Sequence, residues 1–199
     1  MVDPDLLALI GKYDLQGPRY TSYPTAPHWK MIPTADHLRQ TFKRFSDPSS
    51  HPVALYTHIP FCEEKCYYCA CNVVITRHKE KAEEYLQMLR LELAAWSSYI
   101  PNGKVTQIHW GGGTPTYLNV HQMISLFSEY QKYFQISETA EISIEVDPRV
   151  TTREQLAVLR ELGFNRISLV VQDFDSRVQA AIHRDQTEAQ TRTLHAWCR

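Results

Sequence analysis

The stretch VALYTHIPFCEEKCYYCAC, residues 53–71, joins an apolar run to a cluster of cysteines, and it decides how the rest of the chain is interpreted. Residues 53–58 are mostly β-branched, aliphatic or aromatic, which predicts a strand buried in a sheet. Three cysteines follow almost at once, Cys62, Cys66 and Cys69, with the spacing C-x3-C-x2-C. Thiolates are soft ligands that suit iron–sulfur clusters and zinc. We therefore expect a metal or redox site directly beyond the end of this strand.

Predicted strands and helices alternate along the remainder of the chain. Apolar residues at helical spacing predict helices, and short β-branched runs predict strands. The further strands are expected at residues 105–110, 141–146 and 166–171, and the helices at residues 79–99, 120–134, 151–162, 176–183 and 187–197. A strand–helix repeat of about four units implies right-handed crossovers and a parallel sheet. The fold class is α/β, and the order alone permits either an open doubly wound sheet or part of a (β/α) barrel.

Polar residues and glycines follow the ends of the predicted strands. They are Cys62, the run 111–114, the run 145–147 and Gln172. In both architectures the carboxyl ends of parallel strands form the edge where ligands bind. We therefore expect these four loops to converge on one rim.

The cysteine pattern favours an iron–sulfur cluster. Of the five cysteines, four lie within residues 62–71. An odd, tightly clustered set without a secretion signal does not predict a disulfide framework. Three thiolates fit three corners of a [4Fe–4S] cluster and leave one iron open for a small molecule. One alternative is a set of buried structural cysteines or a zinc knuckle, although zinc sites commonly use a second C-x2-C pair. Another is a closed electron-transfer cluster that includes Cys71 as its fourth ligand. Cys198 is interpreted as a surface thiol.

Three other loops contribute candidate residues. Residues 111–115 read GGGTP, and glycines allow the backbone to approach a ligand closely, although they also occur in tight turns. Glu145 ends the third predicted strand and could accept hydrogen bonds from ribose hydroxyls or be a solvated acid. Arg184 could pair with a carboxylate or lie on the surface.

Length and charge limit the class of protein. The 199 residues suffice for one domain with a sizeable core, and the net charge of -1 does not favour a nucleic-acid partner. The sequence contains no apolar run long enough to span a membrane and no recognisable signal peptide. We expect a cytoplasmic protein with neither nucleic-acid nor membrane partners.

Residues 1–50 differ from the rest of the chain. Prolines interrupt any helical pattern there, and GPRYTSYPTAPHW, residues 17–29, predicts an extended arm. A short helix is expected at about residues 34–44, with Thr34 as its N-cap. Residues 51–199 form the predicted α/β core, which we expect to be C-terminally incomplete, because no fifth strand follows and an exposed sheet edge would remain.

The cysteine spacing is the signature of the radical S-adenosylmethionine (SAM) superfamily, and further motifs extend the resemblance over essentially the whole chain. These motifs are GPRYTSYPTA (17–26), YTHIPF (56–61), CACN (69–72), HWGGGTPT (109–116), EVDPR (145–149) and VQDFD (171–175). Together they resemble the oxygen-independent coproporphyrinogen III oxidase family. The resemblance implies a partial (β/α) barrel of the radical SAM type, truncated after about four βα units.

The resemblance also implies a reaction and its cofactors. Coproporphyrinogen III would be oxidatively decarboxylated to protoporphyrinogen IX, with a [4Fe–4S] cluster on Cys62, Cys66 and Cys69, two SAM molecules and an electron donor for the cluster. The residues expected at the cluster-bound SAM are Tyr56, Gly112 and Glu145, and those at the second SAM are Tyr68, Gly113, Thr114, Gln172 and Arg184. Tyr56 and His58 would be the catalytic residues, with His58 near the reacting groups, and Tyr20 would belong to an arm that closes over the site.

Two departures from the family pattern leave alternatives open. Val170 stands where the family usually has glycine, and its bulk would press on the SAM pocket. The family's chains are also more than twice as long as this one. The alternatives are a truncated, non-catalytic cluster-binding remnant and a haem chaperone of the related branch.

Overall fold

The computed structural model describes residues 4–14, 28, 33–43, 52–100 and 104–199, and the chain divides into two compact units, Met1–Leu38 and Arg39–Arg199. The first unit contains a helix, α1 (Pro4–Tyr13), whose residues are all exposed. The prediction that the first fifty residues are irregular up to residue 34 is therefore wrong at α1. Pro4 begins the helix, where its missing N–H costs nothing, so it does not break the segment.

The short helix predicted at about residues 34–44 is present as α2 (Ala35–Lys43). The Thr34 hydroxyl accepts a hydrogen bond from the backbone N–H of His37 at 3.3 Å, which confirms Thr34 as the cap. The extended arm predicted at residues 17–29, which includes Tyr20, lies outside the described residues apart from His28.

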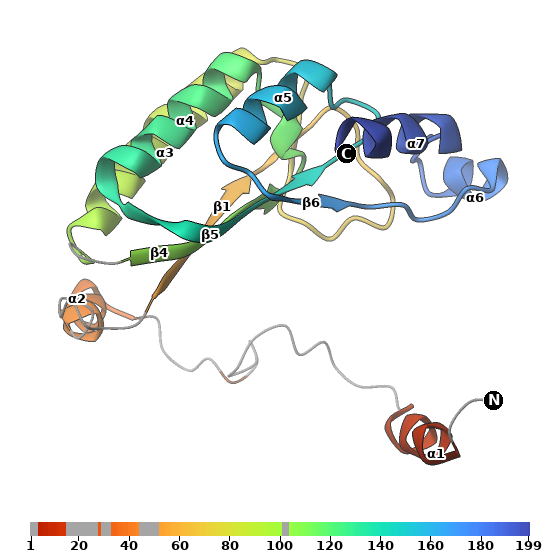
Figure 1. Ribbon diagram of the computed structural model, residues 1–199, viewed down its shortest axis with the longest axis horizontal. Coiled ribbons are helices and arrows are strands. Elements are labelled where there is room, and N and C mark those ends of the chain that lie inside the picture. The colour runs from red at the N-terminus through yellow and green to blue at the C-terminus, as the bar shows by residue number, and fades with distance from the viewer. Residues whose placement is uncertain (1–3, 15–27, 29–32, 44–51, 101–103) are drawn as a thin grey trace. The chain divides into compact units, whose positions relative to one another are not determined.

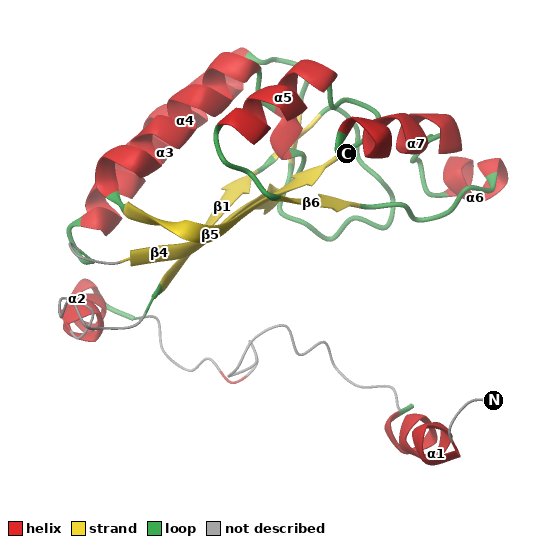
Figure 2. Ribbon diagram, viewed as in Figure 1, coloured by secondary structure: helices red, strands yellow, loops and turns green. Residues whose placement is uncertain are grey.

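The second unit is built on a sheet of four parallel strands, shown in Figure 2. In spatial order they are β1 (Val53–Ile59), β4 (Lys104–Gly112), β5 (Gln135–Val146) and β6 (Arg166–Leu169). The spatial order follows the chain order, whereas a doubly wound sheet reverses direction at a switch point. The sheet is therefore an open part of a (β/α) barrel, as expected from the motifs. β5 begins at Gln135, earlier than the predicted residue 141, because Gln135 and Ile136 already pair with Lys104 and Val105 before the register shifts.

Five helices alternate with or follow these strands. They are α3 (Glu80–Ser97), α4 (Val120–Tyr133), α5 (Arg153–Glu161), α6 (Ser176–Ala181) and α7 (Glu188–Trp197). Capping boxes at Asn119, Thr152 and Thr187 start α4, α5 and α7, because each cap side chain and the residue three positions later satisfy one another's backbone N–H. Figure 1 shows α3, α4 and α5 on the same face of the sheet, as right-handed crossovers between sequential strands require.

An aromatic cluster fills the space between the sheet and these helices. Trp110 of β4 is fully buried, and its ring lies 4.9 Å from that of Phe164 and 6.2 Å from that of Tyr130. The Tyr130 hydroxyl is hydrogen-bonded to the hydroxyl of Thr57 on β1, and burial raises the pKa of Tyr130. This cluster ties the first strand to the helical layer.

A second, smaller sheet brackets the cysteine segment. The two-residue strands β2 (Phe61–Cys62) and β3 (Val74–Ile75) pair in parallel, and the backbone N–H of Thr76 donates to the carbonyl of Cys62 at 2.9 Å. The sequence did not predict this pairing, since two-residue strands carry no periodicity. Within the described residues, no helix is both long enough and apolar enough to cross a bilayer.

Candidate functional site

The cysteine loop, residues 63–73, is closed at its base by the pairing of β2 with β3. Its first half is braced by two ion pairs to the chain that leaves β3, in which Lys79 binds Glu63 and Arg77 binds Glu64, each at 2.8 Å. The backbone N–H of Cys69 donates to the carbonyl of Cys66 at 3.1 Å, which turns the loop between its last two predicted ligands. The loop thus has a defined shape formed by this chain's own residues.

The three predicted ligands and Cys71 line one cavity of about 290 Å³. Cys66 is buried, Cys62 and Cys69 are half-buried, and Cys71 is exposed; all four thiols are free. Burial raises the pKa of Cys62, although a hydrogen bond from the Thr114 hydroxyl, 3.4 Å from its sulfur, acts in the opposite direction. Burial and the neighbouring Cys69 thiol raise the pKa of Cys71.

The donor set fits a cluster better than a single ion. Among the described residues, no three His, Cys, Asp or Glu side chains converge closely enough to hold one metal ion. A structural zinc site requires four such ligands around one centre, whereas the corners of a [4Fe–4S] cube are held by thiolates spread around a larger body. Cys62, Cys66 and Cys69 facing one cavity meet the second requirement and not the first.

Two arginines donate to the sulfur of Cys66. Arg184 Nη1 lies 3.6 Å and Arg149 Nη2 lies 3.8 Å from Cys66 Sγ. Both guanidinium groups also contact Asp147, from which Arg149 Nη2 lies 2.7 Å and Arg184 Nη1 lies 3.5 Å away. Burial raises the pKa of Asp147, but the hydrogen bonds from Arg149 and the charges of both arginines outweigh this, so its pKa is lowered. Arg184 therefore pairs with a carboxylate, one of the two interpretations of the sequence.

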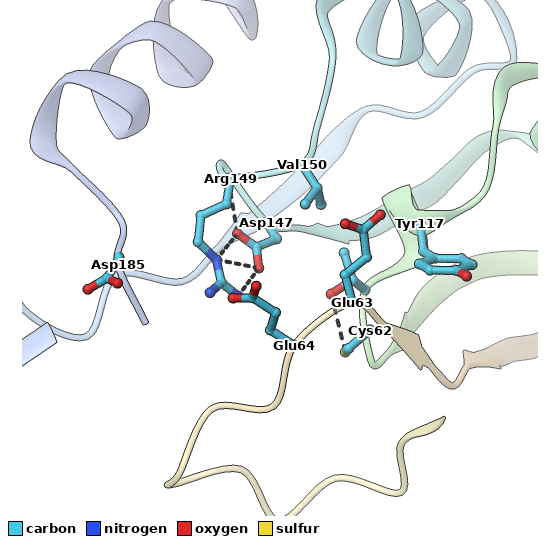
Figure 3. A pocket seen from close by; sticks show the side chains of 9 residues that line it. Cys62, Glu63, Glu64, Tyr117, Asp147, Arg149, Val150 and Asp185 are labelled. Atoms are coloured by element: carbon cyan, nitrogen blue, oxygen red, sulfur yellow. Dashed lines mark hydrogen bonds and ion pairs between the residues drawn. The ribbon is translucent and has the colours of Figure 1, made fainter. Parts of the chain in front are cut away.

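Figure 3 shows the pairing of Arg149 with Asp147 in a second cavity, of about 270 Å³. The Cys62 thiol and the Thr114 hydroxyl, which are hydrogen-bonded to each other, line the same cavity. Glu63 and Glu64 from the cysteine loop line the same cavity. Cys62 lines both cavities, as do Thr114, Asp147 and Arg149. Asp147 belongs to a strand-end run predicted from the sequence, whereas Arg149 was not predicted as a site residue. Its signal was its place in the EVDPR motif, two residues after Asp147.

The glycine run packs against the segment that carries the first cysteine. Gly112 has φ +116°, and a Cβ there would lie 2.7 Å from the ring of His58. A Cβ at Gly113 would lie 2.8 Å from the backbone of Pro60 and Phe61. Glycine is thus required here by close packing as well as by the backbone conformation. Both glycines and Thr114 line the cysteine cavity.

Glu145 is joined to the glycine run and to an aromatic pair. Its carboxylate accepts a hydrogen bond from the backbone N–H of Gly112 at 3.1 Å and lies 3.5 Å from His109 Nε2. The His109 ring stacks on Tyr56 with 5.8 Å between ring centroids, and Tyr56 Oη lies 3.0 Å from His58 Nδ1. Burial, with a contribution from the charge of Glu145, raises the pKa of Tyr56. His109 was not predicted as a site residue, although it begins the motif HWGGGTPT.

The predicted residues do not all share one cavity. Tyr68, Gly112, Gly113, Thr114, Glu145, Gln172 and Arg184 line the cysteine cavity, whereas Tyr56 and His58 line a neighbouring cavity of about 420 Å³. The Tyr68 hydroxyl contacts the thiol of Cys66 and the side chain of Gln172. Val170 also lines the cysteine cavity, and its carbonyl accepts hydrogen bonds from Gln186 at 3.2 Å and Arg184 at 3.5 Å.

Comparison with known proteins defines the class. The family model "Radical SAM superfamily" matches residues 56–199, which is most of the chain and includes the cysteine loop and all four strand ends. The chain therefore belongs to the radical SAM superfamily.

Its relatives define the family more narrowly. The chain is 46% identical over 182 residues to the oxygen-independent coproporphyrinogen III oxidase of Escherichia coli (strain K12), covering 92% of this chain and 39% of that one. It is 48% identical over 142 residues to the protein of the same name from Mannheimia haemolytica, covering 71% of this chain and 95% of that one. Within the superfamily, it belongs to the oxygen-independent coproporphyrinogen III oxidases.

A solved structure has the same fold. The structure of coproporphyrinogen III oxidase from Escherichia coli matches with a TM-score of 0.86 and 42% sequence identity, over 96% of this chain and 42% of that one. The chain thus spans about two fifths of the Escherichia coli relatives.

Proposed function

We propose that this chain forms the cluster- and SAM-binding part of an oxygen-independent coproporphyrinogen III oxidase. The observation that carries the proposal is that the three motif cysteines, the glycine run and Glu145 line one cavity at the carboxyl ends of parallel strands. Such an edge is where ligands bind in barrel-type folds. The names of the relatives supply the substrate and the reaction type, an oxygen-independent oxidation of coproporphyrinogen III. The family resemblance adds that this oxidation would be a decarboxylation in haem biosynthesis.

Cys62, Cys66 and Cys69 would hold the [4Fe–4S] cluster. When bound, the reduced cluster supplies the electron that cleaves SAM to methionine and a 5′-deoxyadenosyl radical, and an external electron donor would replace that electron. The protein's part is to bind and orient the cofactors and the substrate, and to exclude water from them. Arg149 and Arg184 donate to the Cys66 sulfur and so fix the position of this ligand.

The remaining site residues would bind SAM. Glu145, held by the N–H of Gly112, presents a carboxylate that can accept hydrogen bonds from ribose hydroxyls. Gly112 would lie beside the same SAM molecule. Tyr56 stacks on His109, which contacts Glu145, and the Tyr56 hydroxyl contacts His58. Tyr68, Gly113, Thr114, Gln172 and Arg184 would contact a second SAM molecule.

His58 is the proposed residue nearest the porphyrinogen. Its Nδ1 lies 3.0 Å from the Tyr56 hydroxyl and its Nε2 lies 2.7 Å from the carbonyl of Asn72. The overall reaction would remove a hydrogen atom from the β-carbon of each of two propionates. Carbon dioxide would then leave, and one further electron would pass to an acceptor, leaving a vinyl group.

Anaerobic reconstitution tests the proposal. The purified chain would be supplied with iron and sulfide, reduced with dithionite and given SAM, and 5′-deoxyadenosine would be measured. We expect product from the natural chain and from a Cys198→Ala control, and none from Cys66→Ala. Coproporphyrinogen III would then be added and protoporphyrinogen IX measured.

Each alternative predicts a different result. A stable cluster without 5′-deoxyadenosine would identify a non-catalytic cluster-binding protein and implicate Val170 or contacts beyond the matched two fifths of the relatives. Tight haem binding without turnover of coproporphyrinogen III would identify a haem chaperone. Loss of the cluster in Cys71→Ala as well would support four cysteine ligands, and failure to assemble any cluster would contradict the proposal.

A further inference from the structure

The turn after α6 contacts the cysteine loop through the side chain of His183. His183 Nδ1 lies 2.8 Å from the carbonyl oxygen of Lys65, so the ring nitrogen donates to it. The same ring stacks on Tyr67, with 5.1 Å between centroids and an interplanar angle of 18°. Lys65 and Tyr67 are the residues on either side of Cys66. One histidine side chain therefore contacts the loop before and after a proposed cluster ligand.

The residues that flank His183 contact the same three-residue segment. The backbone N–H of Tyr67 donates to the carbonyl of Ile182 at 2.9 Å. Arg184, on the other side, reaches the sulfur of Cys66. Three consecutive residues of the turn thus bind three consecutive residues of the loop. The turn is itself anchored, because the N–H of Arg184 donates to the carbonyl of Gln179 at 2.9 Å.

The backbone of His183 is unusual. Its φ is +54°, and among the described residues no other non-glycine residue has a positive φ. It follows the last residues of α6, at the position where helices commonly end on a left-handed glycine. A side chain at such a position is disfavoured unless its surroundings stabilise it. The contacts of the His183 ring with Lys65 and Tyr67 supply that stabilisation.

We propose that His183 is a positioning residue of the cluster site, which orders the cysteine loop around Cys66 before any metal is bound. The ordering depends only on contacts within this chain. Its consequence for metal retention rests on the function proposed above. A loop that is already ordered loses less conformational entropy when its thiolates bind, so it retains the cluster longer.

Hydrogen exchange of the metal-free chain tests the ordering directly. In His183→Ala we expect the amides of residues 65–69 to exchange about fivefold faster, because one hydrogen bond and one ring stack are lost. Exchange in β4 should not change. The matched control is His121→Ala on α4, an exposed histidine far along the chain from the loop, for which no change is expected.

Two further variants separate the ring from the backbone conformation. His183→Gly relieves the positive φ and removes the ring, and we expect it to lose loop protection as His183→Ala does. Tyr67→Phe keeps the stack and should retain protection, whereas Tyr67→Ala should lose it. The double variant His183→Ala/Tyr67→Ala should lose less than the sum of the two single changes, because the two rings act as one contact. The proposal would be overturned if the loop amides of His183→Ala, or those of His183→Gly, exchanged as slowly as the same amides in the natural chain.

Iron retention against a chelator then tests the consequence. After reconstitution, we expect His183→Ala to lose iron about fivefold faster than the natural chain and the His121→Ala control. Equal rates in all three would overturn the role in cluster positioning, even if the loop exchanges faster. If the natural chain assembles no cluster at all, the function proposed above fails, and the exchange measurement alone decides whether His183 orders the loop.

Discussion

The two faces of the parallel sheet carry different kinds of side chain, buried on one face and polar or exposed on the other, although residues of both faces alternate along the same strands. On β1, Thr57 and Ile59 point into the helical layer and are buried, whereas Tyr56 before Thr57 and His58 between these two residues lie on the other face. Tyr56 is 60% exposed and Ile59 is fully buried. Successive residues of a strand point to opposite faces, so a single run serves both.

The same division continues across β4 and β5. Trp110 and Ile144 are fully buried beneath the helices, which Figure 1 shows on one face of the sheet. Their neighbours His109 and Glu145 lie on the other face and contact each other. The helix-covered face therefore stabilises the fold, whereas the open face and the strand ends carry the residues that are proposed to bind the cofactors. Substitutions on the first should reduce stability, and those on the second should reduce ligand binding.

The largest effect is expected at the centre of the covered face. Trp110→Ala should lower the free energy of unfolding by about 3–5 kcal/mol, because it removes a fully buried indole and leaves a cavity. Urea unfolding followed by circular dichroism measures this. Trp110→Phe should cost clearly less, since it refills part of the space. A loss below about 1 kcal/mol in the alanine variant would contradict the assignment of stability to the helix-covered face.

Asp147 lies at the strand ends, yet it is buried and should also affect stability. Asp147→Asn should cost roughly 3 kcal/mol at pH 7, since Arg149 and Arg184 lose their charged partner. The pKa of Asp147 is lowered by folding, so its contribution is present above the ordinary aspartate pKa of about 4 and is lost as the pH falls below it.

Unfolding measured from pH 7 to pH 3 checks this sign. The difference in stability between the natural chain and Asp147→Asn should shrink as the pH falls below about 4. Glu141→Gln is the control, because its ion pair with Arg166 is exposed and should contribute little. A difference that grows toward acid would show that Asp147 is not stabilised as a carboxylate.

Gly112 tests the point where the open face meets the cysteine loop. Gly112→Ala should cost about 2 kcal/mol, because it adds both backbone strain and a contact 2.7 Å from the His58 ring. Gly163→Ala is the matched control. Its φ of +95° gives similar strain, but the nearest atom to an added Cβ is 3.7 Å away. Equal losses in the two variants would mean that close packing against His58 contributes nothing.

The smallest change in stability, and a clear change in binding, is expected on the open face. Glu145→Ala should alter unfolding by no more than about 0.5 kcal/mol, since its carboxylate is partly exposed. In the reconstituted protein it should weaken SAM binding about tenfold, because it removes the proposed ribose acceptor. Equilibrium dialysis measures this, and Glu141→Ala on the same strand should bind normally. Unchanged binding in Glu145→Ala would remove Glu145 from the proposed site.

Much of the architecture could be predicted because its signals are local. The strand–helix alternation, the helix caps and the parallel sheet follow from side-chain periodicity and from capping residues such as Thr152, and the helix ends differ from expectation by a residue or two. The helix α1 was missed because the prolines that interrupt helical patterns, from Pro18 to Pro33, all follow it in the chain and say nothing about residues 4–13. The pairing of β2 with β3 was missed because two residues show no period.

The candidate site was predicted less completely. The motifs identified Cys62, Glu145 and Gly112, and the structure places them together. They did not show that Tyr56 and His58 line a neighbouring cavity, nor that Arg149 and His183 contact the cysteine loop or its sulfur. The contacts of Arg149 and His183 join residues about eighty to one hundred and twenty positions apart; Arg149 and Cys66, for example, are separated by 83 positions. Local sequence patterns do not reveal contacts between residues so far apart in the chain.

The sequence by itself determined the fold class, the strand ends and the three thiols, because these depend on short-range patterns and on the chemistry of residue types. Only the tertiary structure decided the arrangement around those thiols. It brings the turn after α6 against the cysteine loop, places two arginines and one carboxylate beside Cys66, and joins Tyr56 to Glu145 through His109. The physical reason is that packing and charge pairing depend on distances between segments, and those distances exist only once the sheet has formed.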